Sequence, residues 1–365
     1  MRFGVEEEFF VVDRATRSVA PRAMEVVAEA RKPLGSRVDG EDTLLQVESR
    51  TRPRTAAADV AAQLREGRSW LASAAAGKGL AVVASGTPVL GDALPAPLNE
   101  GERLEAARAT VRGLLDESVF CAVHVHVEVP DRERALLLSN HMRPHLPVLL
   151  ALMANSPYWS ERDTGYASWR PLLWSRWPVA GPPPYFRSER HYDDLVAKML
   201  EAEALTDEGA VHWDIRPSRR HPTLEVRVAD VPITADESAS YAALVRALAQ
   251  SLLPAVERGE PGPRLEPESM RLAYWRAARD GCSGSGVDVR TGELVPFGEL
   301  VRRTLDVAAP ALERNGELRL VTSWLRRLDE SGDGAARQRR VRSERGTLSA
   351  VVDHLIERTE NGTFL

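Results

Sequence analysis

The sequence predicts an α+β fold in which several charged strands lie in one sheet and apolar helices pack against it. Short segments with alternating apolar and charged residues, the pattern of half-buried strands, recur through residues 1–230. Helical patterns dominate the rest of the chain, and segment 236–253 is apolar enough to pack against a sheet. The regular alternation of strand and helix that an eight-fold barrel requires is missing.

Composition excludes several classes of partner. The formal net charge of −5 gives no reason to expect nucleic acid or an anionic membrane as a partner. No apolar run approaches the ~18 residues of a membrane span. The two cysteines, Cys121 and Cys282, make no disulfide framework, and the start MRFGVEEEFFVV lacks the pattern of a secretory signal. We therefore expect a cytoplasmic protein, with a length that allows two domains or one enlarged domain.

The first strand is predicted over residues 2–13, where apolar residues occupy the odd positions. Glu6 and Glu8 share the even face, and Glu7 interrupts the apolar face. Three consecutive glutamates disfavour a strand, but carboxylates grouped on one strand face can bind a hard cation such as Mg²⁺. The alternative is an exposed edge strand whose charges protect it from aggregation.

The next segments supply one more candidate carboxylate. A short strand over 44–51 places Glu48 on one face with its polar neighbours. An Ala-rich amphipathic helix over 56–76, a buried strand over 80–87 and a helix over 99–119 follow.

The segment CAVHVHVEVP, residues 121–130, is predicted to be a strand with a polar face. His124, His126 and Glu128 alternate with valines, so the three polar side chains lie on one side. Two imidazoles and a carboxylate at this spacing can contact a metal or a phosphate. The alternative is a pair of hydrogen-bonded core histidines.

A long aromatic segment follows a helical region over 132–155 that prolines interrupt. Residues 155–186 contain four tryptophans and little periodicity, and a loop of this length inside a compact domain is usually functional. We expect it to cover a site, with Asp163 and Arg170 as substrate contacts. The alternative is a stiff surface wrap.

The segment HWDIRPSRRHPTLEVRVAD, residues 212–230, is predicted to form two strands joined by a turn. Asp214 and Arg216 share a face of the first, and Glu225 and Arg227 share a face of the second. A charged face is costly to bury unless each charge has a partner. The first interpretation is that this charged face binds a charged ligand. The alternative is that the face is exposed to solvent and carries cross-strand ion pairs.

The remaining segments are predicted to be helical apart from a hairpin turn at 288–293. The predicted helices are 192–205, 236–253, 266–279, 297–312, 318–328 and 335–358.

Four strands therefore each carry charged residues on one face, and in one sheet these faces would converge on one cavity. An excess of carboxylates suggests divalent metals, and arginines suggest phosphate or carboxylate ligands, which the guanidinium binds bidentately. Together they suit phosphoryl transfer, in which Mg²⁺ and cationic groups stabilise the moving phosphate.

The motifs also resemble a known family. VEEEFFVVD, HVHV followed by PD, the stretch from NSPYW through DTGYASWRP to GPPPYF, and WDIRPS with PTLEVRVAD are similar to the carboxylate–amine ligase family, in its glutamate–cysteine ligase type 2 branch. The resemblance implies a glutamine-synthetase-like core, with a curved, mainly antiparallel sheet forming a funnel backed by helices. It implies one catalytic domain over 1–365 with a helical C-terminal part from about 297. It also implies a ligase that uses ATP and Mg²⁺ to form an acyl phosphate on a carboxylate, which an amine then converts to an amide.

The same resemblance assigns roles to residues that match its motifs. The metal ligands would be Glu6, Glu8, Glu48 and Glu225. Arg216, Arg227 and His124 would be catalytic, and Arg216, Arg227 and His126 would bind the nucleotide. Arg227 or Arg170 would contact the substrate carboxylate, and the aromatic segment adds Asp163 as a further expected substrate contact. We expect glutamate as the acid, cysteine or a related amine as its partner, and possible assembly as a homodimer.

The sequence departs from the family pattern at three positions. Ala122 and Glu128 stand where relatives have glycine, and Leu44 stands near a usual carboxylate. Glu128 would add a carboxylate to the site face. Two other functions therefore stay open: a metal-dependent hydrolase, since HxH on a strand is also typical of those enzymes, and a non-catalytic relative that binds a nucleotide or metabolite.

Overall fold

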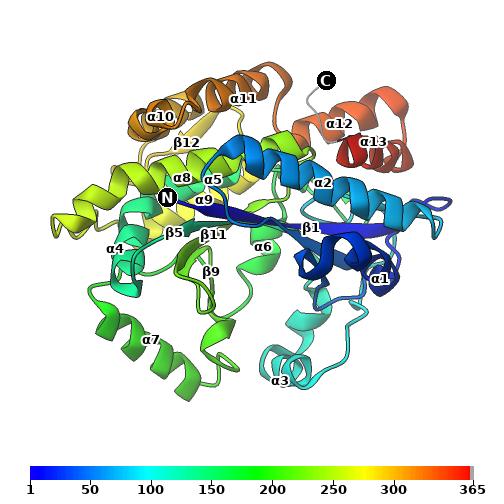
Figure 1. Ribbon diagram of the computed structural model, residues 1–365, viewed down its shortest axis with the longest axis horizontal. Coiled ribbons are helices and arrows are strands. Elements are labelled where there is room, and N and C mark those ends of the chain that lie inside the picture. The colour runs from blue at the N-terminus through cyan, green and yellow to red at the C-terminus, as the bar shows by residue number, and fades with distance from the viewer. Residues whose placement is uncertain (362–365) are drawn as a thin grey trace.

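The computed structural model describes residues 1–361, and its centre is a seven-stranded sheet (Figure 1). The strand order is β10-β11-β5-β1-β3-β2, and β4 also pairs with β1. Every pair in this sheet is antiparallel, which confirms the α+β class and the mainly antiparallel sheet. The strands are β1 (Phe3–Asp13), β2 (Val38–Gly40), β3 (Gln46–Arg50), β4 (Leu80–Val83), β5 (Ala122–Glu128), β10 (Ile215–Pro217) and β11 (Thr223–Asp230).

Helices cover one face of the sheet and flank the other. In Figure 1, α2, α5, α8 and α9 lie above the sheet, α10 to α13 lie further out, and α3 and α7 project below it on either side. The helices are α1 (Ala23–Leu34), α2 (Ala57–Ala76), α3 (Glu102–Val111), α4 (Arg132–Met142), α5 (Leu146–Leu152), α6 (Arg170–Trp174), α7 (Glu189–Glu201), α8 (Ala235–Glu257), α9 (Pro267–Asp280), α10 (Phe297–Arg314), α11 (Leu318–Ser331), α12 (Gly334–Arg345) and α13 (Leu348–Asn361).

Helix α8 is the central helix of the core. It begins at a capping box in which Thr234 and Glu237 satisfy each other's backbone N–H groups. Among residues 1–361 it is the one helix long and apolar enough to cross a membrane, but 67% of its most apolar window is buried inside the protein. That burial is the behaviour of a core helix.

The two faces of β1 explain the run of three glutamates. Phe3, Val5 and Phe9 point toward the helices and are buried. Glu7 lies on that same face, where it is buried in an ion pair with Arg68 of α2. Glu6 and Glu8 are on the opposite face, as the alternation of a strand requires.

Several element predictions need correction. Helix α1 has no predicted counterpart. Segment 155–186 is not an irregular loop throughout, because it contains the hairpin of β6 (Tyr158–Trp159) and β7 (Arg162–Asp163), then α6. The predicted strand over 212–217 is divided: β9 (His212–Trp213) pairs with β8 (Ala180–Gly181), and only β10 joins the main sheet.

The C-terminal region follows its predicted order with one break. The hairpin of β12 (Ser285–Val287) and β13 (Leu294–Pro296) confirms the turn at 288–293. The helix predicted over 335–358 is two helices, α12 and α13, separated at Gly346. Gly346 has φ +77°, a conformation that glycine adopts without steric cost.

Candidate active site

Strand pairing brings the predicted site residues together on the face away from α2 and α8. Glu6 of β1 lies opposite His124 of β5 and Arg50 of β3. Glu8 lies opposite Glu48. Directly opposed residues have neighbouring side chains, so the register alone joins three strands into one cluster.

The other half of the cluster comes from β5, β11 and β10. Glu225 of β11 lies opposite His126 on one side and Arg216 of β10 on the other. A β-bulge between Val226 and Ala229 shifts the register of β11 against β5, and Arg227 lies within this bulge. Bulges re-aim side chains and are common beside active sites.

These side chains line a cavity of about 690 Å³. It is bordered by Arg103 of α3 and Tyr192 of α7, the two helices that project below the sheet in Figure 1. The charged and imidazole side chains lining it from the sheet strands are Glu6, Glu8, Glu48, Arg50, His124, His126, Arg216, Glu225 and Arg227. A polar cavity with converging titratable groups is the expected form of an active site.

Two groups of side chains have the geometry to hold a cation. Donor atoms of Glu6, Glu48 and His124 all lie within 4.8 Å of one another, and so do those of Glu6, His126 and Glu225. Glu6 belongs to both groups. Of the four carboxylates expected from the resemblance, three therefore take part in these groups, and Glu8 lies beside them with its Oε1 3.6 Å from His124 Nε2.

The charges around Glu6 stabilise its ionised form. Burial alone would raise its pKa, but His124 and His126 outweigh burial, and the pKa lies well below its usual range. Glu6 Oε2 is 3.4 Å from His124 Nδ1, and its Oε1 is 3.5 Å from His126 Nε2. Burial and the positive charge of Arg227 lower the pKa of His124.

Glu225 lies between two guanidinium groups. Arg216 Nε donates to Glu225 Oε2 at 2.9 Å, and Arg227 Nη1 donates to Oε1. Although Glu225 is buried, the two arginines hold its pKa below the usual range. Arg227 Nη1 also lies 3.4 Å from His124 Nδ1, so Arg227 joins both halves of the cluster.

A neighbouring pair of glutamates has the opposite perturbation. Burial and the charge of Glu6 raise the pKa of Glu48 to about 8. Glu41 lines the same cavity, and burial together with Glu48 and Glu8 raises its pKa well above the usual value. Positive charge is therefore lacking where these carboxylates crowd together, namely those of Glu6, Glu8, Glu41 and Glu48.

The sequence analysis did not assign a role to Glu41 or Arg50. The acidic run at 39–42 just before the Glu48 strand is the signal that would have indicated Glu41. Arg50 shares the face of Glu48 and forms an ion pair with it. Arg103 and Tyr192 come from helices whose position could not be derived from strand alternation.

The structure does not bring Asp163 and Arg170 into this cavity. Asp163 is exposed and forms an ion pair with Arg339 of α12. Arg170 is buried and forms an ion pair with Asp230. The lining of this cavity therefore does not support the prediction that these two residues contact substrate.

Glu128 also differs from expectation. Its carboxylate pairs with Arg2, whose Nε donates to Glu128 Oε1 at 3.0 Å. The pair lines an adjoining cavity of about 700 Å³, which shares Glu6, Arg50, His126 and His221 with the first. Glu128 therefore borders the outer side of the site, and its charge is already neutralised by Arg2.

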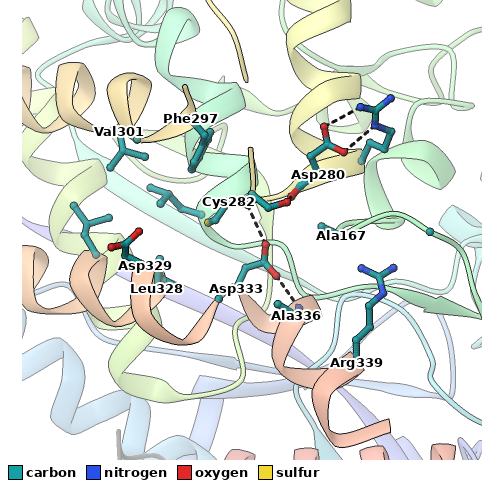
Figure 2. A pocket seen from close by; sticks show the side chains of 17 residues that line it. Ala167, Asp280, Cys282, Phe297, Val301, Leu328, Asp329, Asp333, Ala336 and Arg339 are labelled. Carbon is teal, nitrogen blue, oxygen red and sulfur yellow. Dashed lines mark hydrogen bonds and ion pairs between the residues drawn. The ribbon is translucent and has the colours of Figure 1, made fainter. Parts of the chain in front are cut away.

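A third cavity, of about 630 Å³, lies on the helical side of the protein (Figure 2). Phe297, Val301 and Leu328 form an apolar wall, and Asp333 points toward Cys282, whose backbone N–H donates to it. None of the carboxylates and histidines of the strand cluster lines this cavity. The converging titratable groups are therefore confined to the first cavity and the one that adjoins it.

Two solved structures have the same fold as this protein and indicate its fold class. A crystal structure of glutamate–cysteine ligase from Francisella tularensis in complex with AMP matches with a TM-score of 0.74 at 12% identity, covering 99% of this chain and 88% of that chain. A bifunctional glutathione synthetase from Pasteurella multocida matches with a TM-score of 0.74 at 15% identity, covering 99% and 52%. The fold is thus the one found in glutamate–cysteine ligase.

Sequence comparison then gives the family. The profile of Glutamate-cysteine ligase family 2 (GCS2) matches residues 2–354. Proteins provisionally assigned as glutamate–cysteine ligase 2 are 41% identical in Mycobacterium sp. (strain KMS), over 98% of both chains, and 40% identical in Nocardia farcinica (strain IFM 10152), over 98% of this chain and 93% of the relative. The chain belongs to Glutamate-cysteine ligase family 2 and is an ATP-dependent carboxylate–amine ligase. Membership of this family replaces the alternative interpretation that the protein is a metal-dependent hydrolase.

Proposed function

We propose that the protein joins the carboxylate of glutamate to the amine of cysteine or a related amine, with ATP and Mg²⁺, through an acyl phosphate. The names of its relatives support the two substrates. The observation that carries the chemistry is the single cluster of glutamates, histidines and arginines on one face of the sheet.

The donor atoms suit Mg²⁺ at two overlapping positions. Glu6 and Glu48 with His124, and Glu6 and Glu225 with His126, offer mostly carboxylate oxygens, which Mg²⁺ prefers. Bound Mg²⁺ would neutralise charge on the phosphates of ATP. It would also offset the burial and the repulsion from Glu6 that together raise the pKa of Glu48.

Glu225 links the cation to the phosphate-binding groups. Its two carboxylate oxygens are now held by Arg216 and Arg227. A cation bound to Glu225 would compete for those oxygens and free guanidinium N–H groups for a phosphate. Arg227 Nε is buried and has no hydrogen-bond partner within residues 1–361, so a donor is already available for a ligand.

The two chemical steps follow from this arrangement. A carboxylate oxygen of the acid attacks the γ-phosphorus of ATP, the bond to the β-phosphate oxygen breaks, and ADP leaves. Arg216 and Arg227 stabilise the charge on the transferred group. The amine nitrogen then attacks the acyl carbon, phosphate leaves, and the nitrogen gives up a proton as the amide forms.

The test is release of ADP and phosphate from ATP and Mg²⁺ with amino acids presented singly and in pairs, with products identified by mass. The proposal expects release that requires one acid and one amine, and a product mass equal to their sum less water. Glu225→Gln should abolish release without unfolding the protein, and Glu133→Gln, at an exposed position of α4 that lines neither cavity, is the matched control. ATP binding without turnover for any pair would contradict the proposal and favour the non-catalytic relative.

A further inference from the structure

The bulge that positions Arg227 is held from behind by Arg170. Arg170 Nη2 donates to the backbone oxygen of Arg227 at 2.8 Å and to that of Ala229 at 3.0 Å. These two carbonyls lie on either side of Val228, in the interrupted stretch that ends where the pairing with β5 resumes at Ala229. Arg170 thus replaces the strand pairing that the bulge removes.

Arg170 is itself fixed by a fully buried carboxylate. Its Nε donates to Asp230 Oδ1 at 3.1 Å. Asp230 Oδ2 accepts from the backbone N–H of Asn155 at 2.8 Å, and from the hydroxyls of Ser156 at 2.7 Å and Ser168 at 2.8 Å. A Cβ at Gly86 would lie 2.6 Å from Asp230 Cγ, so the backbone of Gly86 packs directly against the carboxylate.

The chain of contacts continues to the C-terminal helices through Asn155. Its Nδ2 donates to the backbone oxygens of Ala84 at 3.0 Å and Val231 at 2.8 Å. Its Oδ1 accepts from Gln338 Nε2 of α12 at 2.8 Å. Gln338 is completely buried, and a Cβ at Gly334 would lie 2.2 Å from Asn155 Oδ1.

Helix α12 is in turn fixed at its first turn. Asp333 caps the helix by accepting from Ala336 N–H at 2.8 Å, and it also accepts from Cys282 N–H at 3.0 Å (Figure 2). The helix that carries Gln338 is therefore anchored to the loop after α9 and borders the third cavity.

We propose that Gln338, Asn155, Asp230 and Arg170 form a positioning relay that sets Arg227 for phosphoryl transfer. The inference rests on the proposed role of Arg227 and extends it to residues that never touch substrate. It makes the C-terminal helices part of the catalytic apparatus. Buried polar networks of this kind favour one geometry, because a displaced member leaves others unsatisfied. Gln338 Oε1 has no hydrogen-bond partner within residues 1–361, so Gln338 is held in this network through its Nε2 donor.

A double-mutant cycle between Gln338→Met and Arg227→Lys tests the relay. Gln338→Met removes the donor to Asn155 and keeps an unbranched side chain of similar length. We expect it to lower kcat for ADP release at least fivefold on its own. In the Arg227→Lys background it should change kcat less than twofold, because the residue through which it acts is already altered. Arg340→Met, an exposed position on the same helix, is the matched control and should leave kcat unchanged.

Each alternative has a distinct result. A residue that only supports the fold lowers the active fraction, so its effect would multiply with that of Arg227→Lys and would overturn the relay. If Arg227→Lys alone leaves kcat unchanged, the proposed role of Arg227 fails instead. Arg170→Lys, carried through the same cycle, provides the second test if Gln338→Met does not fold, and multiplicative effects there would equally overturn the relay.

Discussion

Replacing Arg68 by methionine should destabilise the protein strongly, because it leaves a carboxylate buried without a counter-charge. Arg68 and Glu7 are each 1% exposed. Arg68 Nε donates to Glu7 Oε2 at 3.1 Å, and Nη1 donates to the backbone oxygen of Ile233 at 2.7 Å. Ser238 is the other donor to Glu7.

The magnitude follows from the burial of both partners. Breaking a buried ion pair by removing one member costs about 3–5 kcal/mol. That is a large share of the roughly 5–15 kcal/mol by which domains are stable. Replacing both charges by apolar groups of similar volume removes the unpaired carboxylate. Glu7→Leu combined with Arg68→Met should therefore cost less than Arg68→Met alone. A remainder of about 1–3 kcal/mol is expected from the unpaired Ser238 hydroxyl and the carbonyls of Pro232 and Ile233.

Equilibrium unfolding in urea at pH 7.5, followed by circular dichroism, measures both variants. The expected order of midpoints is wild type, then the double variant, then Arg68→Met. A loss below 1 kcal/mol for Arg68→Met, or a double variant no more stable than Arg68→Met, would refute the reasoning. Arg65→Met, an exposed position on the same helix, controls for the change of residue type.

Three further predictions concern pH, metal and substrate. Burial lowers the pKa of His145 in the folded protein to about 4. In the unfolded chain the same imidazole binds a proton below about pH 6.5. Up to roughly 3 kcal/mol of the stability present above pH 6.5 should therefore be lost as the pH falls toward 4. Urea unfolding of wild type and His145→Gln at pH 7.5 and 5 should show a smaller loss in the variant, and equal losses would contradict the assignment. Excess EDTA should stop ADP release and added Mg²⁺ should restore it; turnover that persists in EDTA would exclude a metal requirement. Asp163→Asn should leave the KM of both substrates within twofold, since Asp163 pairs with Arg339 outside the cavity; a large rise in either KM would return Asp163 to the substrate site.

Strand alternation was enough to predict most of the cluster. In β1, β5 and β11 the period of two put Glu6, His124 and Glu225 on defined faces before their pairing was known. Their convergence depended on the assumption that these strands lie in one sheet, and the register confirms it. The mainly antiparallel sheet and the ligase class came from the resemblance. The order of the strands was not predicted, because alternation alone does not determine it.

The errors share a physical origin in contacts between distant segments. Arg170 looked like a substrate contact because it lies in an aromatic loop, but its partner Asp230 is 60 residues away and only the fold brings them together. Glu7 likewise interrupts an apolar pattern that Arg68 of α2 completes. Helix α1 was missed because its amphipathic pattern is short and interrupted by charged residues. The homodimer and the cytoplasmic location stay predictions.

Transfer of ¹⁸O from the acid to phosphate tests the central claim most directly. Glutamate labelled in its carboxylate oxygens would be turned over with ATP, Mg²⁺ and cysteine, and the released phosphate and nucleotide analysed by mass. An acyl phosphate predicts one labelled oxygen in inorganic phosphate and none in the nucleotide, since the attacking carboxylate oxygen leaves with the phosphate. Label found in AMP, or phosphate released without label, would contradict the account.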